Sequence, residues 1–237
     1  MIPVVFVPAA PLLLPDVNPT ATADVAAVRA AMHDAARYLA DCARIVAICA
    51  YSDQQPDRVA PVPPWQEWPV DVSTTHDCPT ALTGGAVGSV VPSSVEVARW
   101  VLAELGVMPA VLVSVFGDAA GFTDAARTVT LQPGDGLLVV ADGSAGRHEK
   151  APGHIREGAL EFDAEVAHAL ATGDSAALLA LQPARAEAVL AGGLPAWQAT
   201  ALIVQGYLVC APELLLAADP HHVAYFVATW HLRADLA

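Results

Sequence analysis

The sequence predicts one α/β domain in which helices flank a mostly parallel central sheet, with an antiparallel element at the C-terminal end. A strand at 2–7, a long helix at 22–41 and a second strand at 44–51 follow one another, which is the order of a parallel βαβ unit. The segment 214–230 has the pattern of two strands around a turn at 219–222. No internal repeat or linker divides the 237 residues, so a single domain spanning the whole chain is expected.

The first βαβ unit has the clearest pattern. Residues 2–7 (IPVVFV) are mostly β-branched and aromatic, and Pro8 ends the run. A Pro-rich turn at 9–19 leads into the helix. The strand at 44–51 (RIVAICAY) is apolar along almost its whole length, as expected for a strand that is buried on both faces.

Residues 52–92 form a Pro/Gly-rich segment that interrupts this pattern. A structureless loop of that length is unusual inside a compact domain, so one or two short strands are expected there, the best at 70–74. The glycines at 84–88 lack the GxGxxG spacing of a dinucleotide site. An amphipathic helix is predicted at 93–105, with Gly106 ending it.

The second half of the chain continues the alternation of strands and helices. Buried strands are predicted at 109–116 and 136–144, with a short helix at 118–127 between them. A polar loop at 145–158 follows. Four successive helices are then predicted, each bounded by Gly or begun by Pro, at 159–173, 175–182, 183–193 and 195–208.

The composition excludes several classes of function. Eleven Lys and Arg against 25 Asp and Glu give a net charge of −14, which is unsuited to a nucleic-acid surface. Lys150 is the only lysine, so a polybasic membrane patch is excluded. No apolar run reaches the roughly 18–20 residues of a spanning helix. The four cysteines form no CxxC pair, which predicts reduced thiols in a cytoplasmic protein.

Candidate functional residues follow from the predicted strands, because ligands of open α/β sheets bind outside the carboxyl ends of the strands. That rule selects the segments 8–11, 51–54, 116–118, 142–148 and 219–222. Four histidines lie in or near these segments: His148, His154, His221 and His222. Each one alone is typical of a solvated loop, but their grouping makes them binding candidates.

Asp142, Ser144 and His148 are the catalytic candidates. The run from Asp142 to Gly146 differs from a GxSxG nucleophile elbow in having Asp142 at the first glycine position. An elbow must also lead directly into a helix, which Pro152 disfavours. A turn in which Asp142 and Ser144 bond to nearby backbone is the better supported interpretation.

Four segments of the chain carry a resemblance to a known family: 7–17 (VPAAPLLLPDV), 139–174, 194–202 (LPAWQATAL) and 219–230 (DPHHVAYFVATW). In these segments the chain resembles the LigB-like superfamily of class III extradiol ring-cleavage dioxygenases, especially its small alanine-rich actinobacterial branch. Residues 139–174 are similar to the stretch that reads Gly-Asp-Leu-Ser-His in active members. The resemblance implies a LigB-like fold, Fe(II) held by two His and one carboxylate, and a further His as acid/base.

The residues that the resemblance assigns to this chemistry are missing. The first ligand His would stand at Ala9, the acid/base His at Ala145 and the Glu ligand near Ala218, while 52–55 contains no second ligand His. Alanine and serine side chains cannot replace an imidazole in the coordination sphere of a metal. The family pattern therefore predicts no metal, no resident cofactor and no ring-cleavage activity.

Three hypotheses about function remain. The first is a non-catalytic protein that binds a small molecule or a partner in the old active-site cleft. The second is a metal-dependent enzyme with a rebuilt site, in which Asp142, His148 and either His221 or His222 hold Fe(II) or another divalent metal. These two hypotheses differ in whether any metal is bound.

The third hypothesis is anion binding without a metal. Arg147, Lys150 and Arg156 lie within one stretch of ten residues that follows a predicted strand and could grip a carboxylate or phosphate. The expected ligand is thus small and acidic or aromatic. The alternative is that these cations only balance Glu149, Glu157 and Glu161. Because exposed aromatics favour interfaces, Tyr51, Trp65, Trp68 and the surrounding prolines either cap the cleft or form a contact in a homo-oligomer.

Overall fold

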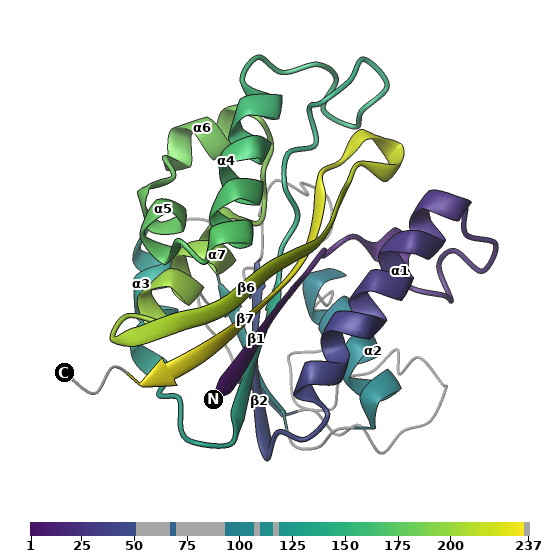
Figure 1. Cartoon of the computed structure of the whole chain (residues 1–237). Coiled ribbons are helices and arrows are strands. Elements are labelled where there is room, and N and C mark those ends of the chain that lie inside the picture. The colour runs from purple at the N-terminus through teal and green to yellow at the C-terminus, as the bar shows by residue number, and fades with distance from the viewer. Residues whose placement is uncertain (51–66, 70–92, 107–109, 116–118, 235–237) are drawn as a thin grey trace, which may run out of the picture.

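The computed structural model describes most of the chain (Figure 1). The described residues are 1–50, 67–69, 93–106, 110–115 and 119–234. Their strands form one seven-stranded sheet in the order β3-β4-β2-β5-β1-β7-β6. The strands are β1 (Ile2–Val7), β2 (Arg44–Ala50), β3 (Glu67–Pro69), β4 (Ala110–Val115), β5 (Asp135–Val140), β6 (Tyr207–Ala218) and β7 (Tyr225–Ala234).

The middle of the sheet is parallel and its borders are antiparallel. Strands β4, β2, β5 and β1 run in the same direction, with Val4 of β1 opposite Leu137 of β5 and Ile48 of β2 opposite Val139. Strand β7 pairs antiparallel with β1, and β6 pairs antiparallel with β7. The predicted fold class, a mostly parallel sheet with an antiparallel C-terminal element, is confirmed.

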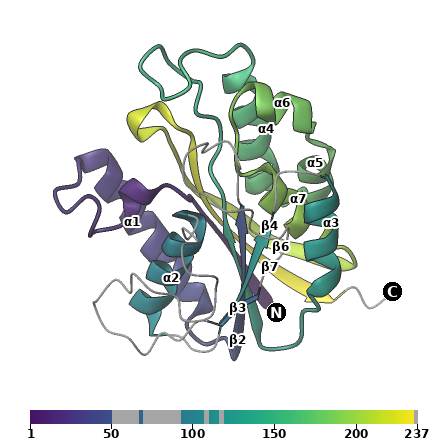
Figure 2. The same ribbon diagram turned by 180° about the vertical axis from the view of Figure 1, so that it is seen from behind.

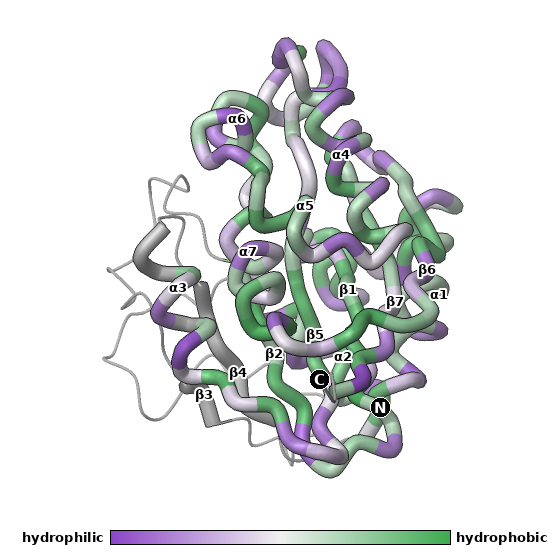
Figure 3. The backbone as a smooth tube through the Cα atoms, turned by 60° about the vertical axis from the view of Figure 1, so that its left-hand side comes forward, coloured by the Kyte–Doolittle hydropathy of each residue, from purple (hydrophilic) through white to green (hydrophobic). Residues whose placement is uncertain are grey.

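The central strands are apolar because helices cover both of their faces. Every residue of β1 and β5 is buried, and β2 is buried from Ile45 onward. Figure 3 shows these strands as green, hydrophobic stretches of the tube. Burial on both faces explains why the sequence shows continuous apolar runs here and no alternation.

The helices divide between the two faces of the sheet (Figures 1 and 2). The helices are α1 (Ala23–Ala36), α2 (Ser93–Leu105), α3 (Ala119–Thr128), α4 (Ala159–Thr172), α5 (Ser175–Ala180), α6 (Pro183–Ala188) and α7 (Leu194–Ile203), with short 3-10 turns η1 (Pro11–Leu13), η2 (Arg37–Leu39) and η3 (Pro220–His222). Helices α1 and α2 form one apolar core against the sheet, around Met32 and Leu102. Helices α4 to α7 form the other core, around Phe162 and Trp197.

Several predicted boundaries were wrong. The helix predicted at 195–208 ends at Ile203, because Gly206 takes a left-handed conformation (φ 83°) from which β6 starts at Tyr207. The strand predicted at 136–144 ends at Val140. Strand β3 is a short strand of the kind expected within 52–92, although its position was not specified, and the best candidate at 70–74 lies outside the described residues.

The topology creates a division at the carboxyl ends of β1 and β5. The chain that leaves β1 continues to α1 on one face, whereas the chain that leaves β5 continues to α4 on the opposite face. Neighbouring strands whose connections diverge in this way mark the ligand-binding edge of an open α/β sheet. The residues that follow Val7 and Val140 therefore stand at the expected position for a site.

Candidate functional site

Asp142 lies at this divergence, two residues beyond the end of β5. Its Oδ1 accepts a hydrogen bond of 2.7 Å from the backbone N–H of Ala9, which follows β1. Asp142 is half-buried, and its surroundings raise the pKa of its carboxyl from 3.8 to about 7, chiefly through desolvation. The Ala9 hydrogen bond opposes that shift only in part. At neutral pH Asp142 therefore exists in both protonation states.

Tyr225, the first residue of β7, is the buried neighbour of Asp142. Burial, together with the charge of Asp142, raises the pKa of the Tyr225 phenol, which therefore keeps its proton. Only 1% of Tyr225 is exposed, so it shapes the surroundings of Asp142 from inside the core. Asp142 is the member of this pair that reaches solvent.

Two glycines allow the backbone to approach Asp142 closely. The N–H of Gly193 donates to the Asp142 carbonyl at 2.9 Å, and the N–H of Gly143 donates to the Ala224 carbonyl at 2.8 Å. A side chain at Gly143 would bring its Cβ to 2.7 Å from the Cβ of Ala224. The absence of side chains at these positions therefore fixes where the chain turns after β5.

Ser144 is buried and does not reach solvent. Its hydroxyl and its backbone N–H both donate to the carboxylate of Asp163 on α4, the backbone bond at 2.9 Å. The residues after Ser144 form no helix before α4 begins at Ala159. Ser144 thus anchors the strand-end turn to α4. The turn interpretation of this segment predicted bonds to nearby backbone, but the partner of Ser144 is the side chain of Asp163, and the partner of Asp142 is the N–H of the distant Ala9.

Arg147 joins Asp163 to the turn at the tip of the β6–β7 hairpin. Its Nε lies 3.4 Å from Asp163 Oδ2, and its Nη1 lies 3.7 Å from Asp219 Oδ2. Lys150 and Arg156 are exposed, and the Nε of Arg156 donates to the Gly153 carbonyl. Arg147 thus faces two carboxylates, whereas the side chains of Lys150 and Arg156 are exposed.

The predicted histidines are brought together only as one pair. The imidazoles of His148 and His222 stack with their centroids 4.2 Å apart. His154 bonds through Nδ1 to the Glu149 carbonyl at 3.1 Å, and His221 is exposed on the η3 turn. Within the described part of the chain, no group of three or more His, Cys, Asp or Glu residues could hold a metal ion.

Two of the three alanines at the expected functional positions lie beside Asp142 and Tyr225. Ala9 donates its N–H to Asp142, and Ala218 pairs with Tyr225 across the β6–β7 ladder. Ala145 instead pairs with Gly153, whose N–H donates to its carbonyl. The segment 52–55, where the resemblance places a further ligand, lies outside the described residues.

Sequence reasoning missed Asp163. It lies on the face of α4 that also buries Ala159, Phe162 and Val166, and it is only 3% exposed. An acid within the apolar face of an amphipathic helix is the signal that could have found it, because a buried carboxylate needs partners.

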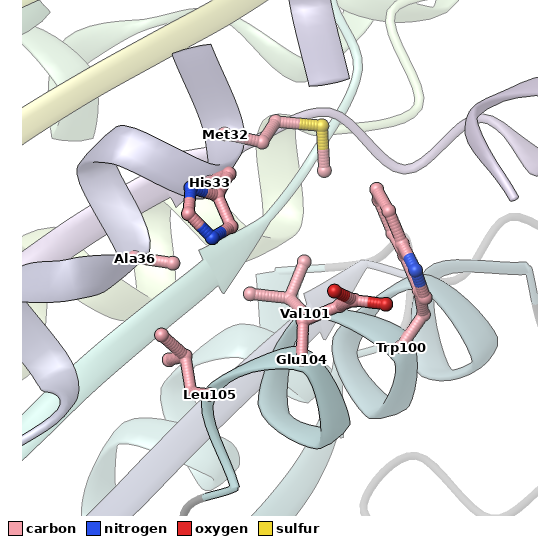
Figure 4. Close-up of a pocket in the computed structure, with 7 residues that line it drawn as sticks. All are labelled: Met32, His33, Ala36, Trp100, Val101, Glu104 and Leu105. Atoms are coloured by element: carbon pink, nitrogen blue, oxygen red, sulfur yellow. The ribbon is translucent and has the colours of Figure 1, made fainter. Parts of the chain in front are cut away.

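Two hollows elsewhere in the described structure do not contain the predicted site residues. One of about 40 Å³ lies between α1 and α2 and is lined by Met32, His33, Ala36, Trp100, Val101, Glu104 and Leu105 (Figure 4). The other, of about 350 Å³, lies at the amino end of β1 and is lined by Met1, Pro3, Tyr38, Asp41, Cys42, Gly134, Asp135 and His231.

No known protein family matches this chain, and no curated protein is significantly similar to it. Among the described residues, every helix is too short or too polar to cross a membrane. The geometry at Asp142 is therefore the main ground for a functional argument.

Proposed function

We propose that this protein is a LigB-like, non-catalytic binder of a small hydroxylated aromatic molecule, and that the ligand binds without a metal at the carboxyl ends of β1 and β5. The observation that carries the proposal is Asp142, a half-buried carboxyl with a pKa near 7 that the Ala9 amide holds in place. In both protonation states such a carboxyl can accept a hydrogen bond, and when protonated it can also donate one. The Asp142 carboxyl can therefore form a hydrogen bond with a hydroxyl group of the ligand in either state.

The resemblance to ring-cleavage dioxygenases supports an aromatic ligand, and the missing side chains support binding without turnover. The positions expected to carry metal-binding or proton-transferring groups hold Ala9, Ala145 and Ala218. A methyl side chain leaves space where an imidazole or a carboxylate would stand. Ala9 and Ala218 would form an apolar wall beside the carboxyl of Asp142, an arrangement typical of small-molecule sites.

The charges favour a neutral ligand over an acidic one. Arg147, the cation closest in sequence to Asp142, faces the carboxylates of Asp163 and Asp219. An ionised Asp142 would repel a ligand carboxylate, and so would the net charge of −14. The cytoplasm is the proposed compartment, because the described cysteines Cys42, Cys49 and Cys210 are free thiols.

Isothermal titration calorimetry with catechol, under nitrogen and with EDTA present, tests the proposal. We expect one catechol to bind per chain, and benzoate to bind at least about tenfold more weakly. Asp142→Ala should weaken catechol binding by about tenfold, because a hydrogen bond to a partly charged group is lost. The matched control is Asp24→Asn at an exposed position on α1, which should leave the affinity unchanged.

The pH dependence gives a second signature. The affinity of the wild type should change between about pH 6 and pH 8 as Asp142 ionises, whereas Asp142→Asn should show a flat profile. An absence of catechol binding, a binding that needs added Fe(II), or an affinity that Asp142→Ala leaves unchanged would each overturn the proposal.

A further inference from the structure

We propose that His148 and His222 form a proton-sensitive latch that closes the edge of the site, and that acidification opens it. This inference concerns the regulation of the Asp142 site and rests on the function proposed above. The latch joins two segments that are far apart in the sequence, the loop 145–158 and the η3 turn between β6 and β7. In Figures 1 and 2 this loop and the tip of the β6–β7 hairpin stand at the same end of the molecule.

The contact itself depends on uncharged rings. The two imidazoles are nearly parallel, with an interplanar angle of 17° and a centroid separation of 4.2 Å. Two imidazolium cations at this distance would repel each other, so the stacked arrangement is disfavoured once both rings are protonated.

A hydrogen bond at His148 also depends on an unprotonated ring nitrogen. The backbone N–H of Lys150 donates to Nδ1 of His148 at 3.1 Å. An imidazole nitrogen can accept this bond only while it carries no proton, and in imidazolium both ring nitrogens are donors. Protonation of His148 therefore removes the acceptor as well as adding a charge next to His222.

The two segments carry titratable and charged residues of both signs: Arg147, Glu149, Lys150, His154, Arg156 and Glu157 in the loop, and Asp219 and His221 at the η3 turn. The carboxylates of Asp163 on α4 and of Asp219 already face the guanidinium of Arg147. A new positive charge on His148 meets this guanidinium on the adjacent residue.

The latch is connected to the site through the backbone. The Ala224 N–H donates to the Ser144 carbonyl, so the segment that leads to His148 and the segment that leads from His222 to β7 are tied together by a backbone hydrogen bond. His221 and His222 both have positive φ, at 57° and 63°. Non-glycine residues with positive φ hold backbone strain and persist only where the surrounding structure keeps them in place. Opening the latch would loosen the segments that carry Asp142 and Tyr225.

Hydrogen–deuterium exchange of the ligand-free protein, corrected for the intrinsic pH dependence of exchange, tests the latch. We expect residues 145–158 and 219–225 to exchange at least about fivefold faster at pH 5.5 than at pH 7.5, while α1 keeps its protection. His148→Asn should abolish this response, because an amide oxygen can still accept the Lys150 N–H but does not titrate. His168→Asn, an exposed position on α4, is the matched control and should behave as the wild type does.

The outcomes separate the latch from the proposed function. Equal exchange at the two pH values would overturn the latch. An acid response of His148→Asn equal to that of the wild type would also overturn it and would assign the response to Asp142 or Asp163. If the latch opens as expected but catechol does not bind, the proposed function fails alone. If catechol binds and exchange does not change with pH, the latch fails alone.

Discussion

Single residues in this protein differ sharply in how they hold a charge, and two aspartates show the contrast. Asp135 is 4% exposed and bonds to the guanidinium of Arg44, which lowers the pKa of its carboxyl. Among the described residues no cation plays this part for Asp142, and burial raises the pKa of its carboxyl to about 7. Asp135 therefore contributes stability that is lost as the pH falls through its lowered pKa, whereas Asp142 contributes stability that is lost as the pH rises.

The effect of Asp142 on folding predicts that its replacement by Asn increases the free energy of unfolding at high pH. The folded protein holds the Asp142 proton up to about pH 7, while the unfolded chain releases it near pH 4, so stability falls between these values. Asp142→Asn should remove this loss and raise the free energy of unfolding at pH 8 by roughly 2–4 kcal/mol relative to its effect at pH 4. Urea denaturation at the two pH values measures the difference.

The control for this measurement is Asp24→Asn, whose carboxyl is exposed on α1. It should change the free energy of unfolding by less than about 0.5 kcal/mol at either pH. A parallel shift of Asp142→Asn at pH 4 and pH 8 would contradict the assigned pKa.

At the scale of elements, the position of Asp142 depends on how α7 docks against the end of β5. Gly193 is the N-cap of α7, and a Cβ there would lie 2.8 Å from the Cβ of Ala141 and 2.9 Å from the backbone nitrogen of Asp142. Its φ of −80° is available to any residue, so the cost of a side chain here is steric.

Gly193→Ala should therefore destabilise the protein by roughly 1–3 kcal/mol, the range for overpacking of a tight contact. It should also weaken catechol binding, because α7 and the strand-end turn must separate to admit the methyl group. Thermal unfolding and calorimetry measure the two effects. The exposed neighbour Gly192 offers the comparison, and Gly192→Ala should be close to neutral. Equal losses in both variants would contradict the steric explanation.

The charge of the whole molecule affects its stability. A net charge of −14 with only 11 cations gives long-range repulsion that favours expanded states. Because salt screens exposed charges, raising NaCl from about 0.05 to 0.5 M at pH 7.5 should increase Tm by about 2–4 °C, or roughly 1 kcal/mol.

The same salt series near pH 5 separates screening from other effects of salt. The pI is about 4.7, so little net repulsion remains there to be screened. Differential scanning calorimetry should then show a change in Tm below about 1 °C. An equal increase in Tm at both pH values would mean that salt acts by strengthening apolar burial and not by screening charges.

Much of the framework could be predicted from the sequence. Strands β1, β2 and β5 are continuous apolar runs with Pro or Gly near their ends, and the strand-end rule selected Asp142, which lies beyond the carboxyl end of β5. The start of β6 was missed, because the apolar residues after Gly206 fit a helix and a strand equally well. Pairing with β7 decides between them.

The sequence by itself determined the fold class, the acidic surface and the absence of metal-binding side chains at Ala9, Ala145 and Ala218, because these follow from local patterns and residue identities. Only the tertiary structure decided that Ser144 is buried against Asp163, that Arg147 faces two carboxylates, and that His148 stacks on His222, 74 positions away. The physical reason is that pKa values, ion pairs and ring contacts depend on which distant segments meet. The spacing of residues along the chain does not show which distant segments come into contact.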